Sequence, residues 1–280
     1  MQWGEIIRTD SGSVEPHLYG TYKPTEMPLW LNAVASEYVQ LRSECTIDLP
    51  DSIDVAGIGI FDVSLIKSKL AEKLVPPSTA TNNPLSVTRS DLSETAAYML
   101  LEREFGTRIA YKLVRDRELI QLPGRGIDAI GIEDGQKLLI ILCEIKFSDE
   151  ASAPKAPQVV DTSKDGMRSQ HRGHLSEISV TVAKIWDCAR RAKNGEIQQS
   201  LMAAALYLEN GMLDHVGIVS CCVLVRPEER HCVEDFGSFK NNPTDYQPAS
   251  VRFLVWLLPG NLNEILNGWE IAVKSAQGGA

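Results

Sequence analysis

The chain has 280 residues, of which 44% are hydrophobic and 23% charged, so it can bury a sizeable core. Its net charge of −9 argues against a simple non-specific nucleic-acid binder, which would usually be basic. The six cysteines form no CxxC pair, which indicates reduced thiols rather than disulfides or structural zinc. The chain shows no signal-peptide pattern and no apolar run long enough to cross a bilayer, so we expect a cytoplasmic protein.

The first 84 residues predict little regular structure. Residues 1–60 are turn-rich, with one expected helix at Leu29–Leu41. Apolar residues at helical spacing predict a second helix at Phe61–Leu74, and the proline-rich segment 76–84 predicts a loop or linker. We therefore expect residues 1–84 to form an N-terminal extension that could contact a partner, and residues 85–280 to form one domain.

From residue 85 onward, helical and strand patterns alternate. A helix is expected from Ser90 to Gly106, followed by strands at Ile109–Val114 and Ile127–Ile132. The run Leu138–Phe147 is apolar almost throughout, which predicts a central strand covered on both faces. Two helices and then two buried strands should follow, at Ser176–Ala192, Ile197–Leu208, His215–Val225 and Val251–Leu258. This order predicts an α/β (or α+β) fold, with a mixed sheet flanked by helices.

Two charged residues, Glu144 and Lys146, interrupt the expected central strand. Buried charges are costly unless they are paired or bind a metal, and residues two apart on a strand point to the same face. Asp128 lies 16 positions before Glu144, across an expected hairpin. Two carboxylates that hold Mg²⁺, beside a lysine that orients water or offsets phosphate charge, suit phosphodiester hydrolysis. A purely structural ion pair between Glu144 and Lys146 is the alternative.

The length of the Asp134-Gly135 turn decides whether Asp128 can join these residues. A two-residue loop would place Asp128 opposite Ile141, on the wrong face of the sheet. A three-residue loop, 134–136, places it opposite Leu142, on the face of Glu144. We therefore predict a three-residue turn or a bulge.

Gly126-Ile127-Asp128, then fifteen residues, then Glu144-Ile145-Lys146 resembles the PD-(D/E)xK nuclease pattern, with isoleucine in the proline position. Members of that superfamily often add an acid from the preceding helix, and Glu94 fits that place. Ser93-Glu94, Leu122–Asp128 and Leu142–Lys146 together resemble the HamA family, the nuclease component of the Hachiman anti-phage system. The resemblance covers roughly residues 85–260.

The resemblance implies a restriction-endonuclease-like core and a DNase that uses Mg²⁺, with Mn²⁺ as a substitute. Asp128, Glu144 and Glu94 would bind the metal, and Lys146 would complete the catalytic set. It also implies a bacterial cytoplasmic protein held inactive by a helicase subunit, HamB, until the helicase engages DNA. Two alternatives remain: a catalytically silent module that regulates a helicase, and a site-specific restriction endonuclease.

The sequence leaves the roles of several further polar residues open. With Asp91 as N-cap, Glu94 would complete a capping box, which is as good an interpretation as metal binding. Arg125 could contact a phosphate or be solvated. His171 and His174 have metal-ligand spacing, but without an acid or cysteine at ligand spacing zinc carries little weight. Basic residues in the polar stretch after the central strand form either a DNA-backbone track or a solvated loop: Lys164, Arg168 and Arg172.

The charge is unevenly distributed along the chain. Residues 1–60 hold three Lys/Arg against nine Asp/Glu, whereas residues 161–195 hold seven against four. The acidic segment could keep the protein off DNA, meet a basic partner, or simply be solvated surface. If the nuclease interpretation holds, this balance favours control by a partner over autonomous attraction to DNA.

Overall fold

The computed structural model describes residues 3–43, 52–55, 59–62, 85–116, 126–151 and 153–278. Seven of its strands form one sheet: β1 (Ile6–Asp10), β2 (Leu18–Pro24), β5 (Arg108–Lys112), β6 (Ala129–Glu133), β7 (Leu138–Phe147), β8 (Val216–Pro227) and β9 (Ser250–Leu258). They lie in the order β1-β2-β9-β8-β7-β6-β5. Strands β2, β9, β8 and β7 are parallel, and β1, β6 and β5 pair antiparallel with their neighbours. The sheet is therefore mixed, as expected. Strands β3 (Ser52–Val55) and β4 (Gly59–Asp62) pair with each other.

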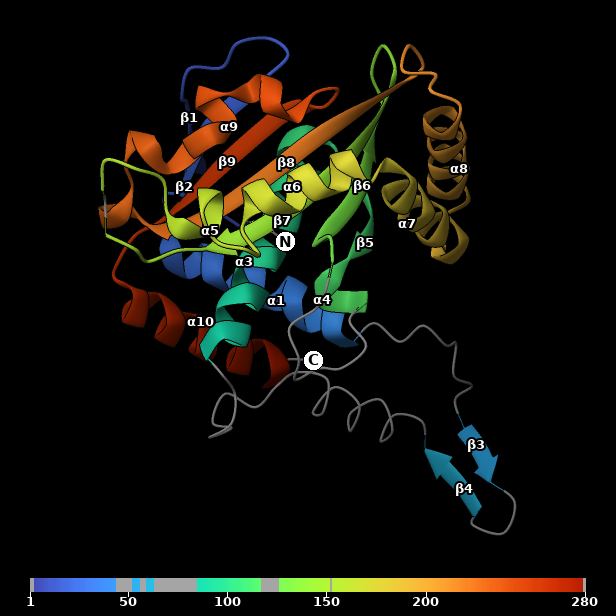
Figure 1. Ribbon diagram of the computed structural model, residues 1–280. Helices are drawn as coiled ribbons and strands as arrows, with labels where there is room; N and C mark the ends of the chain where they lie inside the picture. Colours follow the sequence, from blue (N-terminus) through green and yellow to red (C-terminus); the bar gives the residue numbers. More distant parts are fainter. Residues whose placement is uncertain are drawn as a thin grey trace.

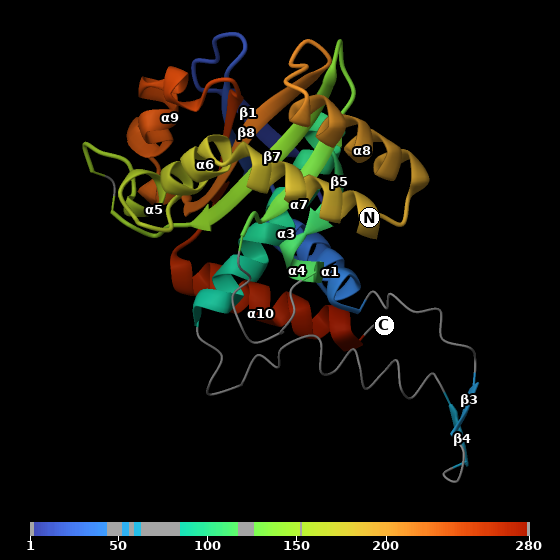
Figure 2. The same cartoon turned by 45° about the vertical axis from the view of Figure 1, so that its right-hand side comes forward.

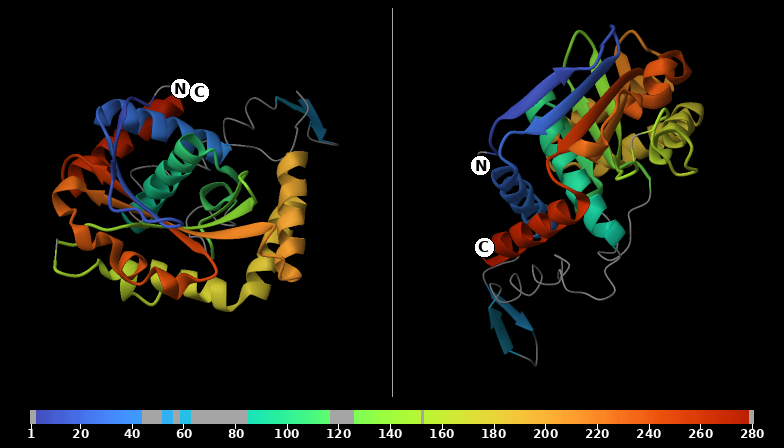
Figure 3. Two further views of the ribbon diagram at one scale, coloured as in Figure 1. Left: turned by 90° about the horizontal axis from the view of Figure 1, so that it is seen from above. Right: turned by 90° about the vertical axis from the view of Figure 1, so that its left-hand side faces the viewer.

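Helices cover both faces of this sheet, which gives three layers (Figures 1 and 3). The α-helices are α1 (Met27–Ser43), α3 (Leu85–Phe105), α4 (Leu113–Asp116), α5 (Gln158–Asp161), α6 (Met167–Ser176), α7 (Ile178–Arg191), α8 (Gly195–Glu209), α9 (Gly237–Asn241) and α10 (Leu262–Gly278). Three short 3₁₀ helices lie between β8 and β9: η1 (Glu228–Arg230), η2 (Val233–Phe236) and η3 (Pro243–Tyr246). None of the helices in the described ranges has the length and apolarity to cross a bilayer.

The core divides according to the alternation of side chains along the strands. Odd-numbered residues of β7 and β8, such as Cys143 and Val223, pack under α1, α3 and α10 together with Trp30 and Trp269. Even-numbered residues face the other layer. At one end they pack under α7 and α8, and at the other under α5, α6 and α9 (Figure 2). Since Glu144 and Lys146 are even-numbered, they belong to the second face.

The N-terminal residues are part of this body. Strand β2 pairs in parallel with β9, and the fully buried Trp30 of α1 packs against Trp256, with ring centroids 5.4 Å apart. The expectation that residues 1–84 form a separate extension is therefore wrong for residues 3–43. Glycine, threonine and tyrosine in β2 resemble a turn-rich segment, and its partner strand comes more than 200 residues later in the sequence.

Other boundaries differ because tertiary pairing overrides local pattern. Residues 61 and 62 of the expected helix Phe61–Leu74 belong to β4, and the rest of it lies outside the described residues, as does the linker 76–84. The helix expected from Ser90 begins at Leu85. The strand expected at Ile109–Val114 ends at Lys112, where α4 begins, and the polar stretch before Ser176 is helix α6 rather than a loop.

The turn between β6 and β7 is longer than predicted but has the required parity. Ala129 pairs with Cys143 and Glu133 with Leu139, so residues 134–138 connect the last pair. The three-residue length is wrong. The odd length is confirmed, and the register puts Asp128 on the face of Glu144.

Candidate functional site

Asp128, Glu144 and Lys146 come together where β6 begins beside β7. Lys146 Nζ lies 3.8 Å from Asp128 Oδ2 and 3.5 Å from Glu144 Oε2. The backbone N–H of Ile145 donates to Asp128 Oδ2 at 2.7 Å, which fixes that carboxylate against the strand. The Glu144 side chain is 1% exposed, whereas that of Lys146 is 27% exposed. Two buried acids therefore lie beneath an ammonium that solvent can reach.

The electrostatics show that the two acids are not fully compensated. Burial raises the pKa of Asp128 to about 7, and Glu144 pushes it in the same direction, while Lys146 and the Ile145 N–H oppose the rise. Burial alone would lower the pKa of Lys146, but Asp128, Glu144 and Glu94 raise it overall. Two carboxylates against one ammonium leave a net negative charge in a poorly solvated place, which favours a bound cation or proton.

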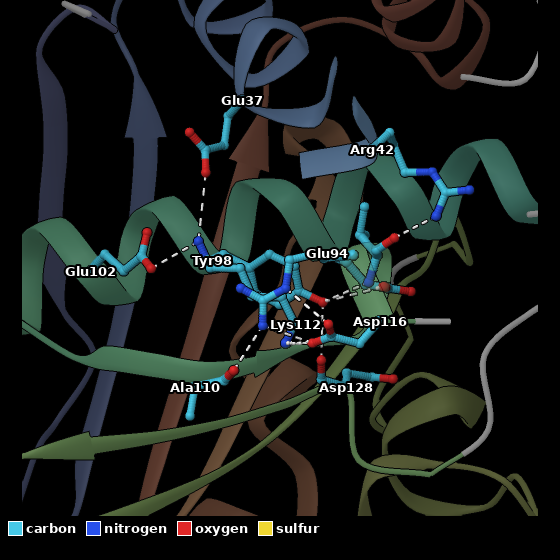
Figure 4. Close-up of polar contacts among 11 residues, drawn as sticks. Glu37, Arg42, Glu94, Tyr98, Glu102, Ala110, Lys112, Asp116 and Asp128 are labelled. Carbon is cyan, nitrogen blue, oxygen red and sulfur yellow. Dashed lines mark hydrogen bonds and ion pairs between the residues drawn. The ribbon is translucent and has the colours of Figure 1, made fainter. Parts of the chain in front are cut away.

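Glu94 approaches the same place from α3, in the opposite helical layer. It is 6% exposed. The Tyr98 hydroxyl lies 3.4 Å from Glu94 Oε2, donates to the backbone carbonyl of Asp128 at 3.0 Å and accepts from the Val114 N–H at 3.4 Å (Figure 4). Glu94 is thus separated from the Asp128 segment by a single hydroxyl group.

The capping interpretation of Glu94 is wrong. Helix α3 begins at Leu85, so Asp91 lies inside the helix and is not its N-cap. Asp91 instead accepts a hydrogen bond at 2.7 Å from the hydroxyl of Tyr38, on α1. With capping removed, the burial of Glu94 beside Tyr98 needs another explanation.

A second cluster of charged residues joins the end of strand β5, next to the site, to helices α1 and α3. Lys112, at the end of β5, lies 2.8 Å from Glu102 of α3 and 3.5 Å from Glu37 of α1 (Figure 4). Its ammonium also lies 5.7 Å from the centre of the Tyr98 ring. These contacts join β5 to both helices and so hold Tyr98 in place.

Helix α6 contributes a residue to the site that the sequence did not identify. His174 is buried, and its Nε2 lies 3.1 Å from Glu144 Oε1. One turn earlier, His171 Nε2 lies 3.1 Å from the carbonyl oxygen of Cys221, and burial lowers the pKa of His171 to about 4. Spacing of three places both rings on one face of a helix. The sequence contained that signal, but only the fold shows that this face covers Glu144.

No three His, Cys, Asp or Glu side chains in the described ranges are grouped as a metal-binding cluster. Of the three predicted metal ligands, Asp128 and Glu144 both contact Lys146. Glu94 contacts Tyr98. The structure therefore brings the predicted residues into one neighbourhood without assembling all three acids around one point.

The predicted DNA-backbone residues do not form one continuous track. Arg168 pairs with Asp245 of η3 at 3.6 Å. Lys164 and Arg172 are exposed, and in the described part of the chain none of the three makes a hydrogen bond or ion pair with the acids of the site. Arg125 lies outside the described residues.

Comparison of this chain with models of protein families, with curated proteins and with solved structures finds no match.

Proposed function

We propose that this chain is a metal-dependent deoxyribonuclease of the PD-(D/E)xK type that hydrolyses phosphodiester bonds. The observation that carries the proposal is the cluster of Asp128, Glu144 and Lys146, with both acids within 4 Å of one ammonium. A structural ion pair would need only one acid for one lysine. The additional buried carboxylate costs stability unless it has a use.

The donor atoms fit a divalent cation such as Mg²⁺. Carboxylate oxygens are the ligands that Mg²⁺ prefers, and Mg²⁺ usually needs only one or two of them because it keeps several waters. Burial and, after it, the neighbouring Glu144 raise the pKa of Asp128, and a bound cation would stabilise its charged form. Asp128 and Glu144 would hold the ion directly, and Glu94 would reach it through water.

The chain's own residues orient the reacting groups. Lys146 has the exposure to reach an attacking water or the phosphate, where its charge offsets the charge that develops in the transition state. His174 fixes one oxygen of Glu144, and the Ile145 N–H fixes one oxygen of Asp128. A bound Mg²⁺ would polarise the phosphate and lower the pKa of water.

We further propose that this activity serves anti-phage defence and is controlled by a helicase partner of the HamB type. The resemblance of the motif segments to the HamA family supports this role. The net charge of −9 supports it as well, because a chain that is repelled by DNA overall needs another means of delivery.

The test is incubation of supercoiled and linear DNA with the full chain and Mg²⁺ or Mn²⁺, with EDTA as the metal-free control. Cutting should disappear in Glu144→Ala and Lys146→Ala. Glu270→Ala and Lys274→Ala are matched controls, since they remove an exposed acid–lysine pair on α10. Activity that survives equally in all four variants would overturn the site.

The same experiment separates the alternatives. A chain that cuts nothing alone, and still cuts nothing when a HamB-type helicase is added to the assay, fits the silent regulatory module. Discrete fragments from linear DNA, rather than a smear, identify a site-specific restriction endonuclease.

A further inference from the structure

A hollow of about 230 Å³ opens between α6 and α7, next to the candidate site. Its walls carry mostly polar groups, from Ser169, Gln170, Gly173, His174, Thr181 and Lys184. A water molecule occupies about 30 Å³ in the liquid, so the hollow has room for several waters or for a small polar group.

Two contacts connect this hollow to the predicted catalytic residues. The His174 ring forms part of its wall, and the Nε2 of the same ring lies 3.1 Å from Glu144 Oε1. At the other side, Lys184 Nζ lies 3.9 Å from the position that a Cβ on Gly126 would occupy. Gly126 has a φ of 102°, a conformation suited to glycine, and it stands two residues before Asp128. Two side chains that line the hollow therefore reach the site: His174 contacts Glu144, and Lys184 lies near Gly126, in the segment that leads into Asp128.

Lys184 supplies a positive charge near Gly126, at one side of the hollow. Lys184 is half-buried, and no carboxylate of the described residues pairs with it. Glu177 also lines the hollow; it is the N-cap residue of α7, seven residues before Lys184, and no ion pair joins the two side chains. The hydroxyl of Ser169 and the amide of Gln170 add hydrogen-bond donors. The Thr181 hydroxyl instead donates to the His174 carbonyl at 2.8 Å. An ammonium beside neutral donors is the chemistry that binds a phosphate oxygen.

The arginines expected to follow the backbone are placed differently. Arg168 and Arg172 are four residues apart and so share one side of α6, and Arg168 extends to Asp245. Neither contributes to the walls of the hollow, which takes Ser169, Gln170, Gly173 and His174 from α6. Among the described residues that line the hollow, Lys184, on α7, supplies the positively charged side chain.

We propose that the hollow between α6 and α7 binds the phosphodiester next to the one that is cut, with Lys184 as its charged contact. The inference rests on the proposed nuclease function and names a substrate-binding subsite for it. A DNA strand whose scissile phosphate lies at Lys146 would continue past His174 toward Lys184.

The experiment measures binding without cutting. Fluorescein-labelled single-stranded and duplex DNA of mixed sequence is titrated with the full chain in EDTA, and fluorescence anisotropy gives Kd at several salt concentrations. The variants are Lys184→Ala and Lys184→Arg, with Lys274→Ala on α10 as the matched control.

Each phosphate contact contributes about −0.9 to the slope of log K against log salt for duplex DNA and about −0.7 for single strands. Duplex binding weakens when the salt concentration rises from about 50 mM to about 200 mM. This loss of affinity should be about 3.5-fold smaller for Lys184→Ala than for the wild type. Lys184→Arg and Lys274→Ala should keep the wild-type slope. A merely structural role would change affinity without changing the slope. An unchanged slope in Lys184→Ala, or no DNA binding by the wild type, would overturn the inference.

Cutting assays with Mg²⁺ distinguish failure of the subsite from failure of the function. If the wild type cuts DNA and Lys184→Ala keeps both its KM and its salt slope, the subsite is refuted and the nuclease proposal stands. If Lys184 determines the salt slope but nothing cuts DNA, the nuclease proposal fails and the binding site remains. If both hold, Lys184→Ala should raise KM with little change in kcat.

Discussion

Replacing Asp128 with asparagine should change how the stability of the protein depends on pH. The carboxyl group has a pKa of about 7 in the folded chain, against a model value of 3.8, chiefly because it is buried and secondarily because Glu144 is adjacent. An asparagine oxygen can still accept the hydrogen bond from Ile145, but the side chain does not titrate. The variant therefore isolates the charge of Asp128.

The sign follows from the raised pKa. Below pH 4 the carboxyl is protonated in both states, and its contribution to stability is fully present. As the pH rises toward 7, the unfolded chain releases the proton while the folded chain keeps it, so the free energy of unfolding falls. A difference of about three pKa units corresponds to about 4 kcal/mol.

Urea denaturation of the wild type and Asp128→Asn in EDTA, between pH 4 and pH 8, measures this difference. Between pH 4 and pH 8, the free energy of unfolding of the variant should rise by about 4 kcal/mol relative to that of the wild type. Mg²⁺ at a hundred times its Kd should raise the free energy of unfolding of the wild type by about 2.7 kcal/mol and leave that of Asp128→Asn unchanged. A difference that stays flat with pH would refute the argument, because it would mean that Asp128 is already compensated without a metal.

Three further substitutions test the surroundings of the site. Glu94→Gln should slow DNA cutting by about 10-fold or more and leave the helix content, measured by circular dichroism, unchanged. A lower helix content with a normal cutting rate would favour a structural role for Glu94. His174→Gln should cut DNA faster than His174→Ala, because the amide can still donate toward Glu144, and equal rates would remove His174 from the site. Arg252→Ala should lower the free energy of unfolding by about 3–5 kcal/mol, because the buried Glu133 loses a partner that donates two hydrogen bonds to it. As a control in the same urea assay, Lys23→Ala, which breaks an exposed ion pair, should lower it by less than about 1 kcal/mol.

Local pattern was sufficient to predict the strand that carries Glu144 and Lys146. The apolar run of β7 had to be central, and the charges at Glu144 and Lys146 had to share a face, because side chains alternate along a strand. Parity also constrained the turn before β7 to an odd length, although five connecting residues rather than three provide it. Period and alternation are properties of adjacent residues, so the sequence alone could determine them.

Contacts between distant segments could not be read in this way. The pairing of β2 with β9 and the packing of Trp30 on Trp256 depend on residues that are far apart in the chain, so the local pattern of the N-terminal segment predicts an extension. The start of α3 excluded capping by Glu94, and helix α6 placed His174 over Glu144.

Residue type and alternation along the chain are enough to identify the polar side chains of the site and the strand face on which they lie. Which of these side chains come into contact depends on how the elements pack. A hairpin brings Asp128 to Glu144, helix α6 brings His174 to Glu144, and helix α7 brings Lys184 to Gly126. The physical reason is that burial, charge coupling and hollows arise where separate elements pack together, and no local window of sequence contains that information.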